Sequence, residues 1–209
     1  MSALRIRRFD PTNPAETDRL YEICLKTGDN GQDATGIYRD PHLIGTLYVG
    51  QYARFAPEFC FVLVDENDEV VGYAVGTPDS VAFDRTLEKH WWPQARATYP
   101  REKYPLSDMR DGYRDPQLVE SLHTWSGSRP EVCEDFPAHF HIDLLPTAQG
   151  GGNGKRLLLR LLDEFRTTGV PGVHLGVSGK NKRAVGFYGR IGFEEVISEP
   201  WGYILGMRF

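Results

Sequence analysis

Glycine dominates one short stretch of the chain, in which four of the five residues from 150 to 154 are glycine. The apolar residues before it predict a buried strand that ends at Pro146, because proline lacks the N–H that a central strand needs. Leucine-rich residues 155–162 after it have the composition of a helix. A glycine loop at a helix start directs backbone N–H groups and the positive end of the helix dipole at one point. This stretch therefore predicts a site for a phosphate or pyrophosphate.

The spacing around the loop excludes two common phosphate ligands. A nucleoside-triphosphate loop needs Ser or Thr directly after its lysine to reach magnesium, whereas Lys155 is followed by Arg156. A dinucleotide fold needs Gly-x-Gly-x-x-Gly near the start of a βαβ unit, and this stretch lacks a third glycine at that spacing. A different phosphate-containing ligand is therefore expected.

Two motifs together resemble the GNAT acyltransferase superfamily. Gln149 begins a Gln-x-x-Gly-x-Gly stretch after a strand that ends in proline, similar to the acetyl-CoA loop of that superfamily. Residues 181–193 follow the pattern Asn-x-x-Ala-x-x-Phe-Tyr-x-x-x-Gly-Phe, which resembles the helix on the far side of the cofactor. Each motif alone is weak, but their order and separation match the superfamily.

The resemblance implies one α/β (α+β) domain over residues 1–209, with a mixed, mostly antiparallel twisted sheet flanked by helices. Residues 59–64 and 70–76 predict the central hairpin of that sheet. A long insertion, about residues 78–137, precedes the predicted cofactor strand. It contains three of the four tryptophans, and we interpret it as a helical lid beside the acceptor cleft, although its aromatic residues could equally serve packing.

The resemblance also implies acetyl-CoA as cosubstrate and a set of residues that bind it. The glycine loop should donate backbone N–H groups to the pyrophosphate, and the backbone of the cofactor strand should pair with the pantetheine arm. Asn181 is expected either to bond the cofactor arm or to cap its helix. The predicted cofactor-binding residues are Leu144, Leu145, Gln149, Gly150, Gly151, Gly152, Asn153, Gly154, Lys155, Asn181, Ala184 and Tyr188.

Direct acyl transfer from a thioester to an amine needs a proton acceptor and a proton donor. Tyr188 matches the tyrosine that donates a proton to the departing thiolate, and a phenol stays protonated at neutral pH. Asp143 is our predicted base, acting directly or through water, because it lies nearest the expected thioester. His141 and His139 occupy every second position before Asp143 and so share its face of the strand. They are alternative bases, as is the more distant Asp33. No metal site is predicted.

Residues 20–100 resemble, more narrowly, the acetyltransferase-like domain at the C-terminus of eukaryotic O-GlcNAcase. The likeness includes Pro57-Glu58-Phe59-Cys60-Phe61 and Gly72-Tyr73-Ala74-Val75-Gly76. The cofactor loop is degenerate in that domain and complete here, and no glycosidase portion is present, so no sugar hydrolysis is expected. The favoured function is acetylation of a protein lysine, an N-terminus or a small amine. The alternative is a module that binds acetyl-CoA or a protein partner without turnover.

Composition further limits the classes of binding partner that we expect. A formal charge of −5 and a pI near 5.7 argue against nucleic acid and anionic membranes. The three cysteines are scattered without a Cys-x-x-Cys pair, which predicts reduced thiols. The N-terminal residues lack an apolar signal region and no apolar run could span a bilayer. We therefore expect a cytoplasmic protein.

Overall fold

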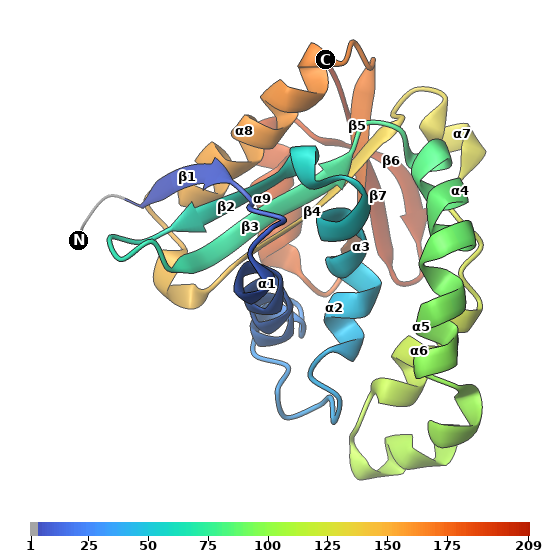
Figure 1. Ribbon diagram of the computed structural model, residues 1–209. Coiled ribbons are helices and arrows are strands. Elements are labelled where there is room, and N and C mark those ends of the chain that lie inside the picture. The colour runs from blue at the N-terminus through green and yellow to red at the C-terminus, as the bar shows by residue number, and fades with distance from the viewer. Residues whose placement is uncertain (1–3) are drawn as a thin grey trace.

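A computed structural model describes residues 4–209 and shows one sheet with helices on both of its faces (Figure 1). Residues 1–3 of the N-terminal stretch considered above lie outside the described part. The strands are β1 (Arg5–Arg8), β2 (Cys60–Val64), β3 (Val70–Thr77), β4 (Ala138–Leu144), β5 (Gly172–Ser178), β6 (Glu194–Glu199) and β7 (Gly202–Arg208). The main helices outside the insertion are α1 (Pro14–Thr27), α2 (Leu43–Tyr48), α3 (Gly50–Phe55), α8 (Asn153–Thr167) and α9 (Lys182–Ile191).

The sheet has the strand order β1-β2-β3-β4-β5-β7-β6. Neighbouring strands are antiparallel except for β4 and β5, which run parallel. The predicted mixed, mostly antiparallel sheet and its central hairpin are therefore confirmed. The hairpin strands β2 and β3 are almost entirely buried because helices cover both faces of the sheet at this point.

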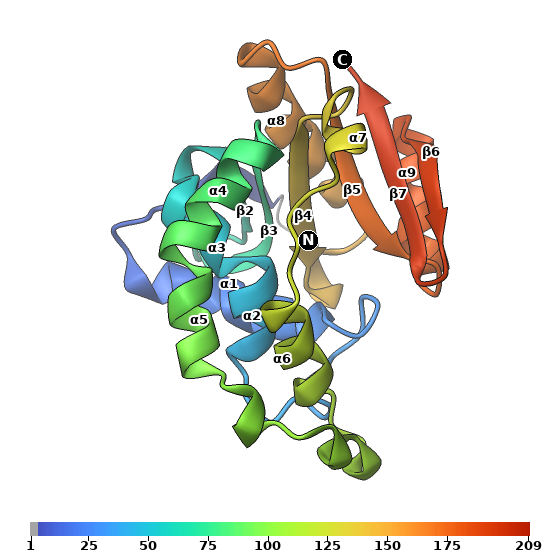
Figure 2. The same ribbon diagram turned by 90° about the vertical axis from the view of Figure 1, so that its right-hand side faces the viewer.

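The parallel pair β4 and β5 separates soon after it forms. Only Ala138 with Val173 and His139 with His174 are paired, and the rest of β4 pairs with β3 alone. The two strands diverge towards their C-terminal ends, which splits the sheet along this line (Figure 2). One edge of β4 beyond residue 139 therefore has backbone groups without a strand partner.

The residues of β4 alternate between two cores. Phe140 points to the face covered by α8 and α9, where leucines of α8 and Phe193 pack. His139 points to the opposite face, where it contacts the rings of Tyr52 and Phe83 in the core formed with α1, α2 and α3. In Figure 1, α1 lies in front of the sheet and α8 behind it. This alternation explains why polar residues of β4 gather on one face.

The segment between β3 and β4 is helical. It contains α4 (Ser80–His90), α5 (Trp92–Thr98), α6 (Asp115–His123) and α7 (Pro130–Cys133), with short 3-10 turns between α5 and α6. These helices extend from one side of the sheet, beside α2 (Figures 1 and 2). The buried carboxylate of Asp115 accepts hydrogen bonds from the N–H groups of Arg39 and Asp40. The segment thus supports the loop between α1 and α2.

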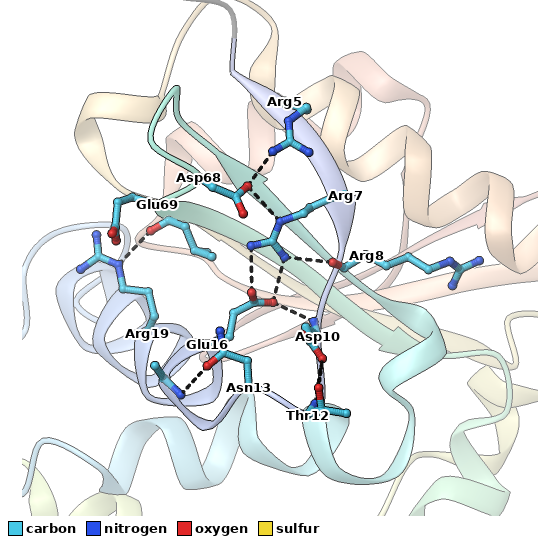
Figure 3. A network of polar contacts seen from close by, with 12 residues as sticks. Arg5, Arg7, Arg8, Asp10, Thr12, Asn13, Glu16, Arg19, Asp68 and Glu69 are labelled. Atoms are coloured by element: carbon cyan, nitrogen blue, oxygen red, sulfur yellow. Dashed lines mark hydrogen bonds and ion pairs between the residues drawn. The ribbon is translucent and has the colours of Figure 1, made fainter.

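An ionic network fixes the edge strand β1 to its neighbours (Figure 3). The guanidinium of Arg7 contacts Asp68 in the β2–β3 turn and the buried Glu16 of α1. Hydrogen bonding to Glu16 raises the pKa of Arg7. Glu16 also accepts the N–H of Asp10. The negative charge of the buried Glu16 is therefore compensated by Arg7 and by this hydrogen bond.

One helix differs from the sequence expectation. The apolar spacing over residues 43–52 predicts one helix, whereas the structure has a break at Val49 between α2 and α3. The break brings Gly50 against Tyr21, and a Cβ at this position would lie 1.9 Å from the tyrosine hydroxyl oxygen. Packing against a residue distant in sequence therefore overrides the helical spacing of the apolar residues. Over residues 4–209, no helix combines the length and apolar character needed to cross a membrane.

Candidate active site

A cavity of about 900 Å³ passes through the split between β4 and β5. On the α8 and α9 side it is lined by the glycine loop, Phe187 and Tyr188. On the other side it is lined by Thr27 and by residues 30–32 of the loop after α1. Asp143 of β4 lines it between the two. The cavity therefore brings residues from both faces of the sheet to one place.

The glycine loop forms the anion-binding end of this cavity. Gly150, Gly151 and Gly152 have φ angles of 86°, 57° and 78°, which turn three successive residues into the left-handed region that favours glycine. Helix α8 follows without a side-chain cap. Within the described chain, no acceptor takes the N–H groups of Gly151, Gly152, Gly154 and Lys155. These donors and the helix dipole fit a pyrophosphate.

Basic side chains line the same cavity. The lining contains five cationic residues and one acidic residue, Asp143. The cationic residues are Lys155, Lys180, Lys182, Arg183 and Arg190. Although the whole chain carries a formal charge of −5, this region therefore favours an anionic ligand.

Two predicted polar residues of the loop have structural partners. Gln149 donates from Nε2 to the carbonyl oxygen of Leu144 and accepts from Arg183 across the cavity, at 2.8 and 2.7 Å. Asn153 donates to the carbonyl oxygen of Ala148 at 3.1 Å. Both side chains therefore hold the loop in place, and both residues also line the cavity.

The start of α9 forms the facing wall. Oδ1 of Asn181 accepts the N–H of Ala184 at 3.0 Å, so Asn181 caps the helix, which is one of the two roles considered. Asn181 and Ala184 also line the cavity. The Nδ2 of Asn181 lies close to Gly31, where a Cβ would be 3.9 Å away. The loop after α1 therefore lies close to the start of α9.

The backbone of β4 presents only some of its residues to the cavity. The N–H of Leu145 donates to Val71 and its carbonyl oxygen accepts from Ala148, both at 2.9 Å. The sheet thus uses the N–H of Leu145. The prediction that the backbone of Leu145 pairs with the cofactor arm therefore needs correction. Because backbone groups of an antiparallel strand alternate in direction, Leu144 and Ile142 face the split instead. Both residues line the cavity.

Tyr188 lies on α9 beside the split. The residue is 9% exposed, it lines the cavity, and its ring packs edge-on against Phe140 and Phe193. Its hydroxyl has no hydrogen-bond partner within residues 4–209. Burial, with a further contribution from the Asp143 carboxylate, raises the pKa of Tyr188 well above its usual range. The phenol is therefore a protonated donor with its proton available to a ligand.

Asp143 is held by two donors at the same oxygen. Oδ2 of Asp143 accepts the hydroxyl of Tyr73 at 2.8 Å and lies 3.0 Å from Nε2 of His141. The imidazole of His141 stacks on the ring of Tyr48 and contacts the ring of Tyr73 in a tilted arrangement. Within the described chain, Oδ1 has no such partner, so this oxygen is available to a ligand in the cavity.

The two remaining candidate bases do not share this position. His139 is bonded at both ring nitrogens, to Ser80 at 2.6 Å and to Tyr52 at 2.7 Å. Burial lowers the pKa of His139 to about 3, so it is a neutral structural group. Asp33 is exposed and accepts from Thr35 within its own loop, away from the cavity lining.

Two residues beside the predicted base were absent from the sequence prediction. Tyr73 is brought opposite Asp143 by the pairing of β3 with β4, across a separation of 70 residues. Cys24 of α1 lies beneath His141 and Asp143. The only local signal for Tyr73 is its position in the predicted hairpin, and that signal does not identify its partner.

The comparisons with known proteins agree with this geometry. Residues 4–193 match the acetyltransferase (GNAT) family. The O-GlcNAcase of Rattus norvegicus is 28% identical over 195 residues, which cover 92% of this chain. The chain spans only about a fifth (20%) of that relative's length.

Solved structures extend the likeness over the whole chain. The crystal structure of SsHAT is 32% identical and superposes with a TM-score of 0.87, covering 99% of this chain and 98% of that one. The paia N-acetyltransferase of Thermoplasma acidophilum, solved in complex with coenzyme A, has a TM-score of 0.59 at 12% identity, with all of both chains covered. The latter shows the shared fold alone. The chain belongs to the acetyltransferase (GNAT) family, whose members are N-acetyltransferases of the EC 2.3.1 type.

Proposed function

We propose that this protein transfers an acetyl group from acetyl-CoA directly to a primary amine. The observation that carries the proposal is that Tyr188 and Asp143, from the two sides of the sheet, line one cavity at the split between β4 and β5. The unpaired N–H groups of the glycine loop and the cationic residues that line the cavity suit the phosphates of the cofactor. The other side of the cavity, lined by the loop after α1, suits the acceptor.

The residues divide the proton chemistry between them. Oδ1 of Asp143 takes a proton from the acceptor ammonium, while Tyr73 and His141 fix Oδ2. The backbone edge of Ile142 and Leu144 orients the acyl group in the split. Since amine and thioester are then held side by side, much of the barrier is lowered by proximity alone.

Tyr188 acts at the sulfur. Its raised pKa keeps it protonated over the neutral range, so its O–H can hydrogen bond to the thiolate as the carbon–sulfur bond breaks. A thiol is ordinarily a stronger acid than a phenol. We therefore expect the main contribution of Tyr188 to be this hydrogen bond, and the thiolate to receive its proton as the product leaves.

Calorimetric titration with acetyl-CoA, followed by thiol release against a panel of small amines, basic peptides and free peptide N-termini, tests the proposal. We expect binding to the protein and release with at least one class of acceptor. Failure of acetyl-CoA to bind would refute the assignment of the glycine loop. Binding without release on any acceptor would support the alternative, a module that holds acetyl-CoA without turnover.

The base is tested by a matched pair of carboxylate substitutions. Asp143→Asn keeps the shape of the side chain and removes its basicity, so kcat should fall roughly 100-fold or more, as for loss of a general base. Asp33→Asn changes an exposed carboxylate outside the cavity and should leave kcat unchanged. Equal activity of Asp143→Asn and the wild type would remove Asp143 from the mechanism.

A further inference from the structure

Three potential metal ligands lie together beneath the proposed acceptor position. The sulfur of Cys24 on α1 and one ligand atom each from His141 and Asp143 on β4 all lie within 4.8 Å of one another. They meet because α1 packs across β3 and β4 on the face to which the polar residues of β4 point. No step of the transfer proposed above uses Cys24.

The donor set has the chemistry of a transition-metal site. A thiolate, an imidazole and a carboxylate are the three ligand types that bind Zn²⁺, whereas calcium and magnesium select oxygen. A thiolate and a carboxylate together neutralise a dication. A buried zinc complex of this composition therefore carries no net charge, which lowers the cost of placing it inside the protein.

The distances are compatible with coordination after a small adjustment. Nε2 of His141 and Oδ2 of Asp143 are 3.0 Å apart, which corresponds to an angle of about 97° at a zinc ion roughly 2.0 Å from each atom. A sulfur ligand at about 2.3 Å would lie roughly 3.5 Å from the other two donors. In the structure, the three ligand atoms lie within 4.8 Å of one another. Side-chain movements of about 1 Å would therefore bring the sulfur to the distance that zinc requires.

The surroundings leave one side of this cluster open. Cys24 is 1% exposed, whereas the side chains of His141 and Asp143 are 33% and 18% exposed, and Asp143 lines the cavity. A fourth coordination position would therefore face the cavity. Tyr73 donates to the Asp143 carboxylate, the kind of outer contact that orients a metal ligand.

We propose that Cys24, His141 and Asp143 bind one Zn²⁺ ion and that its binding inhibits acetyl transfer. Zinc forms bonds to sulfur, nitrogen and oxygen, keeps one water at the fourth position and releases its other bound waters to solvent. The thiol proton is released to solvent, and His141 carries its remaining proton on Nδ1. The metal takes the position between Nε2 and Oδ2 and occupies Asp143. The binding stands on the cluster alone, whereas the inhibition rests on the proposed function.

Metal binding is measured without acetyl-CoA or acceptor, so that it is independent of activity. Titration of the full chain with Zn²⁺ should give one site and proton release, and Co²⁺ should give a thiolate-to-cobalt absorption band. Cys24→Ala, and the nearly isosteric Cys24→Ser, should weaken binding at least 100-fold and abolish the band. Cys133→Ala removes another buried thiol and should bind as the wild type does. Unchanged binding in folded Cys24→Ala or Cys24→Ser would overturn the proposal.

Inhibition is then measured by thiol release with a working acceptor. Zinc should abolish wild-type turnover and a chelator should restore it, while Cys24→Ser should keep its basal activity and lose most of the sensitivity. Equal sensitivity of Cys24→Ser and the wild type would refute this mode of inhibition. If no acceptor supports turnover at all, the titrations above still decide the metal site, so failure of one proposal does not hide the other.

Discussion

Helices α8 and α9 begin on opposite walls of the same cavity, and their first turns are constructed differently. Helix α8 starts after three left-handed glycines and has no side-chain cap. Helix α9 starts at Asn181, whose side chain accepts the N–H of Ala184. One helix thus leaves its first donors unpaired, whereas the other satisfies one of them internally.

The difference separates two tasks. Unpaired N–H groups are costly where a ligand does not take them, so the start of α8 is suited to an anion. The capped start of α9 instead fixes the direction of the helix. Tyr188 follows Asn181 by seven residues, nearly two full turns, and both line the cavity. In the proposed mechanism, the cap positions Tyr188 and the start of α8 binds the cofactor phosphates.

The largest effect should come from removing the hydroxyl on α9. Tyr188→Phe keeps the buried ring among Phe140 and Phe193, so the fold and acetyl-CoA affinity should persist while kcat falls roughly 100-fold. Because the pKa of Tyr188 is raised, its proton is not lost in the neutral range. The pH profiles of the two proteins should therefore have the same shape between about pH 6 and 9. A loss of activity at alkaline pH that is found in the wild type and not in Tyr188→Phe would contradict this assignment.

A pair of glycine substitutions at the two ends of α8 tests the anion site. Gly152 and Gly169 have similar φ angles of 78° and 76°, and a Cβ at either would meet no atom within 4 Å. Alanine at either position should therefore cost a similar 1–2 kcal/mol of stability through the left-handed backbone. Only Gly152→Ala should also weaken acetyl-CoA binding, by about tenfold or more, because the loop donors turn away.

The comparison is read by calorimetry on both folded variants, with urea unfolding to measure the shared loss of stability. Equal cofactor affinity for Gly152→Ala and Gly169→Ala would show that the loop conformation does not determine binding. A loss of affinity in both would assign the effect to general destabilisation of α8.

Features of the site that lie within one short segment could be predicted from the sequence. The strand, the glycine loop and the start of α8 are contiguous, and the second motif places Asn181 and Tyr188 on one helix. Asp143 and His141 share a face because alternation along a strand requires it, and their 3.0 Å contact confirms this. Local rules thus predicted the glycine loop, the start of α8 and the polar face of β4.

Features that depend on strand register or on packing of distant segments could not be predicted in this way. Leu145 belongs to the predicted strand, as its neighbour Leu144 does, but only the pairing with β3 shows that its N–H is taken. The contact of Tyr73 with Asp143 needs the same register across the helical insertion. Cys24 needs the angle at which α1 crosses the sheet. Such contacts bring together the polar groups around Asp143.

The smallest effect should come from the cap of α9, and it decides whether the two helix starts differ in task. Asn181→Ala removes the cap and should cost about 1 kcal/mol of stability. Asn181→Asp keeps an acceptor for the N–H of Ala184 and loses the Nδ2 donor near Gly31, so its stability should remain close to wild type. If Asn181 acts only as a cap, acetyl-CoA affinity should be nearly unchanged in Asn181→Ala, and kcat should fall at most about fivefold through looser positioning of Tyr188. Weaker cofactor binding in both variants would instead make the Asn181 amide a direct ligand of the cofactor arm, and α9 would then share the binding task with α8.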